Sequence, residues 1–527
     1  MSSPWPAATE VPAVDPEEGW RRLAKRTIWV APLRPLATLL LTGLVVVTFR
    51  GWDRLGFFEP AIGVVVAVGG FALSAWVWST TRFRVTPTHV ELRSGLLVRK
   101  HRAVARDRLR TVDITADLLH RAAGLAVVAI GTGRQGGESD DELKLESLVR
   151  ADADELRTVL LARTPGAAAP LDRPGSVVPA APAQGAEEVI SRFDPRWVLL
   201  APLSLMGIVA VAVVAGAGAQ LLRTAAGDQV WRSAPALAIF DLVTSVPVLV
   251  AVVVGLVVLL VANAVLSPVL YVLVYGGYRL TRPAGHGSLH VTYGLVTQRS
   301  VTIEEARIRG VRLAEPLLLR LVKAGRLAAV AAGLGAKKGA EGNEKSTNDM
   351  LLPMAPVAEA HRVTAAVLRC TASPLAVPVH RHPTAALRPI LLQWAVLAVP
   401  AVVLGVLAAL DLVPAWIPQV ALVLVAAAVA GAWLEYTNLG HARAGDYLVA
   451  RHGSGVRTTA AVRCDGIIAW QFRRTVFQRR PRLLTATAAV AAGKGTHTIS
   501  YAGQDRILLV ARDAVPGLLD PFLERDD

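Results

Sequence analysis

Residues 84–104, RVTPTHVELRSGLLVRKHRAV, decide the fold of the polar part of this chain. Val90 and Leu92 alternate with Glu91 and Arg93, a period of two that is typical of a strand with one buried face. The pair Ser94-Gly95 predicts a turn. Residues 96–104 then return as a second strand, so the segment predicts a β-hairpin.

This pattern occurs three times. Gly95 is followed after fourteen residues by Leu109, after ten more by Leu119 and after two more by Arg121. The same spacings recur at Gly294, Ile308, Leu318 and Arg320, and again at Gly453, Ile467, Phe477 and Arg479. Each block adds further strand-like runs and a closing helix, predicted at 151–163, 356–369 and 513–523. The spacings indicate one small helix-capped β-barrel or sandwich used three times.

Six long apolar stretches separate the polar blocks. They cover residues 35–49, 60–79, 197–222, 247–275, 389–410 and 417–434, and none contains Lys, Arg, Asp or Glu. Most approach the ~20 residues that a helix needs to cross a ~30 Å hydrocarbon layer. The chain is also 53% hydrophobic and only 18% charged. We therefore predict an integral membrane protein with six transmembrane helices in three hairpin pairs, in which Asn263 forms a helix–helix hydrogen bond.

Basic residues predict the orientation in the membrane. The loops inside the three pairs hold only four, Arg50, Arg54, Arg223 and Arg232. In contrast, Arg34, Arg196 and Arg388 lie directly before the first helix of each pair. Positive charge favours the cytoplasmic side, so we expect a multi-pass protein of the cell membrane with both termini and all three polar blocks in the cytoplasm.

The predicted organisation has nine segments. They are a disordered, basic amino-terminal tail (1–27), helix pair 1 (28–79), β-rich domain 1 (80–163), a Pro/Ala-rich linker (164–190), helix pair 2 (191–275), domain 2 (276–370), a second linker (371–386), helix pair 3 (387–434) and a divergent domain 3 (435–527).

The polar blocks resemble a known family. Phe83-Arg84-Val85-Thr86, the Ser94-Gly95-Leu96 turn and residues 118–125, LLHRAAGL, are similar to the bacterial pleckstrin-homology (PH-like) domain of the YdbS-like type. The alternation of helix pairs with three such domains resembles its larger membrane members. The resemblance implies cytoplasmic PH-like domains that bind lipid head groups or protein partners. It does not imply an enzyme or a cofactor.

The net charge of +15 favours a partner surface of negative sign. Membrane lipids and a protein partner or self-association are the expected partners; nucleic acid is not expected. Basic side chains are the candidate contacts to anionic lipid or to a partner, at Lys100, Arg102, Arg106, Arg108, Arg121, Arg320, Arg473, Arg474, Arg479, Arg480 and Arg482. Arg121, Arg320 and Arg479 share one position in the three copies, where an arginine could contact a ligand or could instead hold a turn. We find no catalytic motif and no metal-ligand spacing.

The sequence predicts a non-enzymatic, membrane-anchored scaffold or binding protein at the inner leaflet. Two alternatives stay open, a transporter or lipid-handling membrane protein and a factor for tolerance to envelope stress or antimicrobial peptides.

Overall fold

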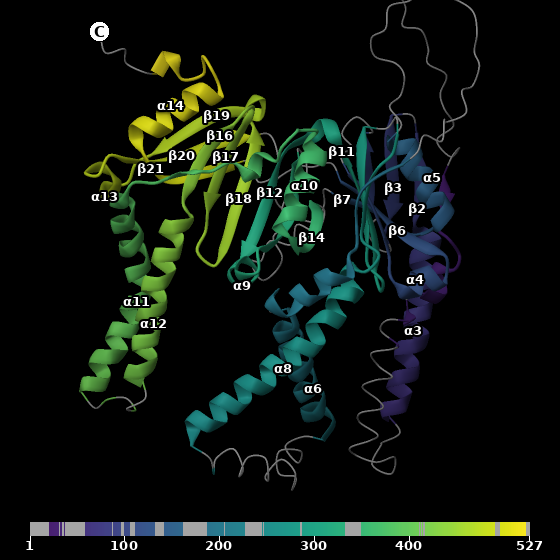
Figure 1. Cartoon of the computed structure of the whole chain (residues 1–527). Coiled ribbons are helices and arrows are strands. Elements are labelled where there is room, and N and C mark those ends of the chain that lie inside the picture. Colours follow the sequence, from purple (N-terminus) through teal and green to yellow (C-terminus); the bar gives the residue numbers. More distant parts are fainter. Residues whose placement is uncertain are drawn as a thin grey trace, which may run out of the picture. The chain divides into compact units, whose positions relative to one another are not determined.

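The structure is a computed structural model. It describes residues 20–30, 32–33, 36, 58–86, 88–95, 100–105, 111–131, 142–161, 187–204, 206–226, 245, 247–284, 287–331, 349–410, 412, 414, 417–490 and 496–522. The chain divides into two compact units (Figure 1). Unit 1 holds Met1–Leu109, Ala116–Ile130 and Glu142–Pro165, and unit 2 holds the remainder.

Unit 1 contains the first repeat. A four-stranded antiparallel sheet has the order β1-β2-β3-β4, with β1 Arg21–Arg22, β2 Arg82–Val85, β3 His89–Ser94 and β4 Lys100–Ala105. The other elements are α1 Thr27–Val30, α3 Phe58–Thr80, α4 Leu118–Ala122, β6 Leu125–Gly131, β7 Glu142–Val149 and α5 Arg150–Leu161. The strand β5 (Thr111–Ala116) lies where the division between the units runs.

Unit 2 begins with the second repeat. Its first elements are β8 Glu188–Arg192, η3 Pro195–Ser204, α6 Met206–Ala226, α8 Val248–Tyr275, β9 Arg279–Arg282, β10 Ser288–Tyr293, β11 Gln298–Glu304 and η5 Glu305–Arg307. They continue with β12 Ile308–Pro316, α9 Leu317–Leu321, β13 Ala324–Ala331, β14 Met350–Pro356 and α10 Val357–Leu368.

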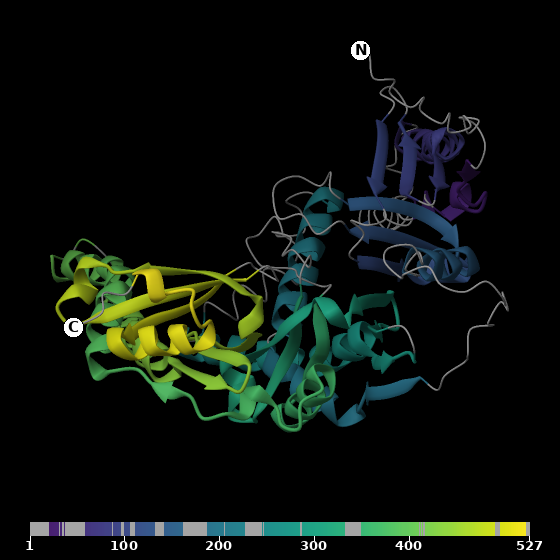
Figure 2. The same cartoon turned by 90° about the horizontal axis from the view of Figure 1, so that it is seen from above.

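The third repeat completes unit 2. It comprises η6 Pro374–Ala376, β15 His380–Arg381, η7 Thr384–Ala386, α11 Leu387–Ala409, α12 Ile417–Asn438, β16 Gly440–Ala444, β17 Tyr447–His452, β18 Val456–Arg463 and η8 Cys464–Gly466. It ends with β19 Ile467–Arg473, α13 Val476–Arg479, β20 Leu483–Val490, β21 Thr496–Gly503, α14 Gln504–Ala514 and η9 Asp520–Phe522. Figure 2 shows α14 lying across the last strands, where it packs on β20 and β21.

Each helix pair is inserted between two neighbouring strands of its β-rich domain. The strand before the helices pairs with the strand after them, antiparallel, as β1 with β2, β8 with β9 and β15 with β16. Two of these leading strands have only two residues, Arg21–Arg22 and His380–Arg381. The chain therefore leaves each sheet at one strand and returns to the adjacent one, which fixes the base of the helix pair to the sheet.

The second and third repeats share one sheet. In the seven-stranded order β14-β13-β12-β18-β17-β16-β15, the strand β12 of repeat 2 pairs with β18 of repeat 3. Their register runs without a bulge from Gly310 opposite Val462 to Pro316 opposite Val456. Gly310 permits this close approach, because a Cβ there would lie 2.1 Å from the carbonyl oxygen of Ala461. Repeats 2 and 3 are thus one continuous body.

The hairpin turns of the three repeats confirm the sequence alignment. Gly95, Gly294 and Gly453 have φ angles of 131°, 103° and 106°, a region that favours glycine. An added Cβ would meet a backbone oxygen at 2.1 Å at both Gly294 and Gly453. The turns therefore require the glycine from which the repeat spacing is counted.

The prediction of six membrane-spanning helices in three pairs is confirmed only in part. Among the described residues, two helices are long and apolar enough to cross a membrane, Val253–Tyr275 within α8 and Ile417–Asn438, which is α12. Two bent pairs raise the number to four if each counts as one span: 195–204 with 206–220, bent by 63°, and 384–396 with 399–409, bent by 54°. Most of the predicted stretch 35–49 lies outside the described residues, and 60–79 falls within the apolar helix α3.

Prolines and polar side chains account for the two bends. Pro400 lies inside α11 and cannot donate a hydrogen bond to the carbonyl of Val396, one turn earlier. At the other bend Asn263 of α8 donates to the Pro202 carbonyl at 2.8 Å and accepts from the Ile208 amide at 3.0 Å. Ser267 accepts from the Gly207 amide at 3.0 Å. These contacts satisfy backbone groups that the break frees, and they confirm Asn263 as a helix–helix hydrogen-bonding residue.

The carboxyl end of α8 is embedded in the domain that follows it. Tyr271 and Tyr278 are fully buried, and their hydroxyls donate to the carbonyls of Met354 and Leu351 in β14. Burial raises the pKa of Tyr278 above its ordinary range. The 28 residues of α8 span about 42 Å at 1.5 Å per residue, enough to cross ~30 Å of hydrocarbon and still reach this core.

The closing helix of the third repeat is displaced from its predicted position. The prediction placed it at 513–523, whereas α14 runs from Gln504 to Ala514. Ile507, Ala511 and Ala514 form its buried face. Pro516 and Pro521 follow the helix instead of interrupting it, because a proline is unfavourable in a helix interior.

Candidate functional site

Three short helical turns carry the shared arginine of the repeats. Arg121 lies in α4, Arg320 in α9 and Arg479 in α13. Three residues further on, Gly124, Lys323 and Arg482 all adopt a positive φ, of 68°, 52° and 50°. Such a φ is uncommon for residues other than glycine. The three turns, α4, α9 and α13, are therefore one structural feature in three copies, and we call them the basic turns.

In the second repeat, the basic turn is bonded to the end of a membrane-length helix. Arg320 donates from Nη1 to Oδ1 of Asn438, the last residue of α12, at 2.9 Å. Asn438 in turn donates to the carbonyl of Gly453 at 2.7 Å. Arg451 donates to the carbonyl of Asn438 at 3.1 Å. Arg320 thus holds the turn against the exit of α12, which supports a structural role for this copy.

A buried ion pair lies beside this arrangement. Glu315 at the end of β12 is 4% exposed and accepts two hydrogen bonds from Arg457 of β18, at 2.8 Å and 2.6 Å. The pair joins repeats 2 and 3 across their shared sheet. Burial, with Arg457 also nearby, lowers the pKa of Arg451, whereas Glu315 acts in the opposite direction. The buried Glu315 carboxylate therefore offsets part of the positive charge of the guanidinium groups around it.

The third basic turn bears the densest positive charge. Arg473 ends β19, and Arg474, Arg479, Arg480 and Arg482 follow it or lie in α13, all with exposed side chains. Thr475 and Gln478 form a reciprocal capping box that fixes the turn. Arg474 donates to the carbonyl of Arg479 at 3.0 Å. The structure thus brings together five of the predicted basic residues on one exposed turn.

The predicted basic residues of the first repeat fall into separate places. Lys100 and Arg102 belong to β4, and Arg121 lies on the exposed side of α4. Arg106 and Arg108 lie outside the described residues. Asp117 caps α4 by accepting from the His120 amide at 2.7 Å.

Comparison with known proteins establishes the family. The sequence profile described as "Bacterial PH domain" matches residues 33–164, 234–370 and 395–512, which together make up more than half of the chain. The chain belongs to the bacterial PH domain family. No curated protein and no solved structure gives a match. The expected three-copy bacterial PH-like protein is thereby confirmed.

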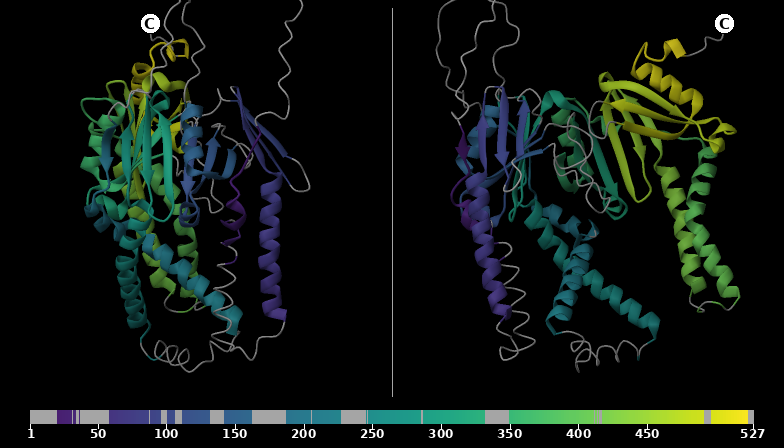
Figure 3. Two further views of the ribbon diagram at one scale, coloured as in Figure 1. Left: turned by 90° about the vertical axis from the view of Figure 1, so that its right-hand side faces the viewer. Right: turned by 180° about the vertical axis from the view of Figure 1, so that it is seen from behind.

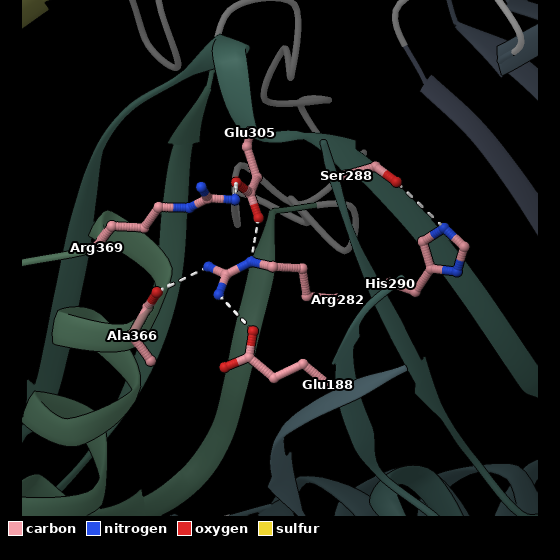
Figure 4. Close-up of polar contacts among 7 residues, drawn as sticks. All are labelled: Glu188, Arg282, Ser288, His290, Glu305, Ala366 and Arg369. Atoms are coloured by element: carbon pink, nitrogen blue, oxygen red, sulfur yellow. Dashed lines mark hydrogen bonds and ion pairs between the residues drawn. The ribbon is translucent and has the colours of Figure 1, made fainter. Parts of the chain in front are cut away.

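An arginine network in the second PH-like domain was not predicted from the sequence. Figure 4 shows Arg282 of β9 in contact with Glu305, with Glu188 at 2.9 Å and with the carbonyl of Ala366 at 2.8 Å. Arg369, at the left-handed end of α10, donates to Glu305 at 2.7 Å. Burial lowers the pKa of Arg282, but the carboxylates of Glu305 and Glu188 outweigh it and raise the pKa above its ordinary value. The network ties α10 to the sheet of the domain.

Two buried histidines form a second unpredicted pair, in the third PH-like domain. Nε2 of His382 lies 2.9 Å from Nδ1 of His441, and the two residues are 5% and 1% exposed. Burial lowers the pKa of His382 to about 4 and that of His441 to about 3. Both rings are therefore neutral at pH 7, and one donates its N–H to the other. Within the described residues, no group of three or more His, Cys, Asp or Glu side chains could hold a metal ion.

Proposed function

We propose that this bacterial PH domain protein is a non-enzymatic, membrane-anchored scaffold. Its PH-like domains bind lipid head groups or protein partners at the inner leaflet of the cell membrane. One observation carries the proposal: α8 and α12 pass into the first following strands, β9 and β16, over at most three residues. Domains joined so tightly to membrane-length helices stay within reach of a membrane surface.

The charge distribution supports the cytoplasmic side. Arg196 and Arg388 lie at the amino-terminal ends of η3 and α11, where the two bent apolar segments begin, and the β-rich domains hold most of the basic residues. This distribution supports our proposal that the domains and both termini lie in the cytoplasm, because basic residues favour that side of the membrane. An anionic inner leaflet is also the surface that a chain of net charge +15 would favour.

The bent helices bear on the transporter alternative. Broken helices with freed backbone groups form substrate sites in many transporters. Here, however, Asn263 and Ser267 bond to the freed groups of Pro202, Gly207 and Ile208. The backbone groups at this break are already hydrogen-bonded within the protein, so they do not need a substrate as a partner. This favours a structural role for the break and supports the scaffold over the transporter.

Anchoring predicts resistance to alkaline extraction. When membranes from cells that produce the full chain are washed with sodium carbonate, the protein should remain in the pellet, because apolar helices within lipid are not released by high pH. Known integral and peripheral proteins of the same cells serve as controls. Release together with the peripheral control would contradict the proposal.

A further inference from the structure

The basic turns expose large apolar side chains beside their arginines. Val476 and Phe477 of α13 are 72% and 63% exposed. Leu321 of α9 is 76% exposed, and Leu118 of α4 is 54% exposed. The position three residues before the shared arginine is exposed and apolar in all three repeats, as Leu118, Leu317 and Val476, which are 54%, 38% and 72% exposed. Single exposed apolar residues are common, but this recurrence in three repeats is not explained by chance exposure.

The fold prevents these side chains from turning inward. The third residue of the turn points into the domain instead, as the buried Leu319 in α9 and the buried Gln478 in α13. Gln478 is held by its capping box with Thr475 and by a hydrogen bond to Thr485 at 3.0 Å. The next strand then begins with a fully buried residue, Ala324 or Leu483. The apolar groups are therefore fixed outward.

The turns lie at the ends of the domains from which the apolar helices emerge. In unit 2, α9 packs against η3 and is bonded through Arg320 to the last residue of α12. Figures 1 and 3 show α13 directly beside the first turns of α11. In unit 1, Arg26 donates to the carbonyl of Ala123 after α4, and Arg26 directly precedes α1, which packs along α3. Each turn thus lies at the level where a helix would enter lipid.

We propose that the three basic turns insert into the anionic surface of the same bilayer that holds the helices. This inference rests on the proposed membrane anchoring. Apolar side chains gain by entering the lipid interface, and each nearby arginine is attracted to anionic head groups. The turns would hold each PH-like domain against the leaflet. The bilayer in which the helices are embedded is then the ligand that the basic turns bind.

Environment-sensitive probes test the insertion. In a chain with Cys370→Ser and Cys464→Ala, single substitutions Leu321→Cys and Phe477→Cys carry the fluorophore NBD. Leu509→Cys is the matched control, because Leu509 is 60% exposed on α14, at the opposite end of the domain from α11 and α12 (Figure 1). Each labelled full chain is placed, one per disc, in nanodiscs of phosphatidylcholine with or without phosphatidylglycerol.

We expect blue-shifted emission and several-fold weaker iodide quenching at positions 321 and 477 than at 509 in discs that contain phosphatidylglycerol. At position 477, Arg479→Gln with Arg480→Gln should restore much of the quenching, whereas Arg506→Gln with Arg512→Gln on α14 should not. Equal quenching at 321, 477 and 509 would overturn the inference. So would protection at 321 and 477 that appears only when two chains share a disc, because the occupant would then be a second copy. Neither result affects carbonate resistance, so anchoring is tested separately.

Discussion

Replacing Arg457 by Met is expected to lower the free energy of unfolding by about 3 kcal/mol. The substitution leaves the Glu315 carboxylate 4% exposed and without its bidentate partner. A buried ion pair contributes little net stability, but a buried carboxylate without a partner is strongly destabilising, because the cost of removing it from water is no longer offset. Arg451 lies near enough to reduce this cost but does not replace the two hydrogen bonds.

Two further variants show whether the buried charge is the cause. Glu315→Leu should cost less than Arg457→Met, because the Arg457 side chain is 27% exposed and can turn toward water. The double variant Glu315→Leu/Arg457→Met should lie within about 1 kcal/mol of the wild type, since it removes both charges. Urea unfolding of the full chain in detergent, followed by tryptophan fluorescence, measures all three. A double variant as unstable as Arg457→Met would show that packing, not charge, is responsible.

Acidification is expected to destabilise the third PH-like domain through its histidine pair. The pKa values of His382 and His441 fall from 6.5 to about 4 and about 3 in the folded state. Between pH 6.5 and 5, His382 and His441 therefore bind protons in the unfolded chain but stay neutral in the folded chain. The folded state loses stability as the pH falls through this range. Two such groups cost about 3 kcal/mol over that range, because the unfolded histidines are half protonated at pH 6.5 and almost fully protonated at pH 5.

Geometry explains why protonation is resisted. Protonation of both rings would bring two positive charges together, because Nε2 of His382 lies only 2.9 Å from Nδ1 of His441. Arg451, Arg506 and the neighbouring His380 add further positive charge around the pair. Melting temperatures from pH 7 to 5 test the effect, with His382→Asn/His441→Leu to remove the pair and the exposed His380→Gln as the control. The control should keep the wild-type slope and the double variant should lose much of it. Equal slopes in all three proteins would exclude the pair as the cause.

The sequence was sufficient for the repeat and for the core of each hairpin. Alternation in residues 84–104 predicted the pairing that β3 and β4 form, and the glycine spacing identified turns that do require glycine. The spacing also predicted that Arg121, Arg320 and Arg479 are equivalent, as their three short helices show. These features follow from local patterns that act within a few residues.

Features that depend on distant partners could not be predicted. The strand β15 has two residues, too few for any alternation, and it exists because β16, more than fifty residues later, pairs with it. The pairing of β12 with β18, and with it the Glu315–Arg457 ion pair, joins strands of two different repeats. The sequence of either strand alone does not indicate which other strand it pairs with. Tyr278 follows the apolar stretch 247–275, but its side chain is buried in the domain core, where its hydroxyl donates to the carbonyl of Leu351 in the distant strand β14.

The sequence alone also could not show which apolar residues of the basic turns are exposed. Phe477 and Leu321 sit in segments rich in both apolar and basic residues, and the sequence marks the arginines as candidates. Which side chains point outward depends on the capping of the turn and on the residue with positive φ that ends it. Only the folded turn separates Phe477, which is exposed, from Gln478, which is buried.

The side of the membrane on which each segment lies tests the proposed position of the PH-like domains. In a background without Cys370 and Cys464, Leu509→Cys places a thiol on α14, and Leu412→Cys places one in the connection between α11 and α12, where Leu412 is 67% exposed. A membrane-impermeant maleimide is applied to intact cells and, separately, to permeabilised cells. We predict labelling at position 412 in intact cells and at position 509 only after permeabilisation. Labelling at position 509 in intact cells would contradict the placement of the PH-like domains at the inner leaflet.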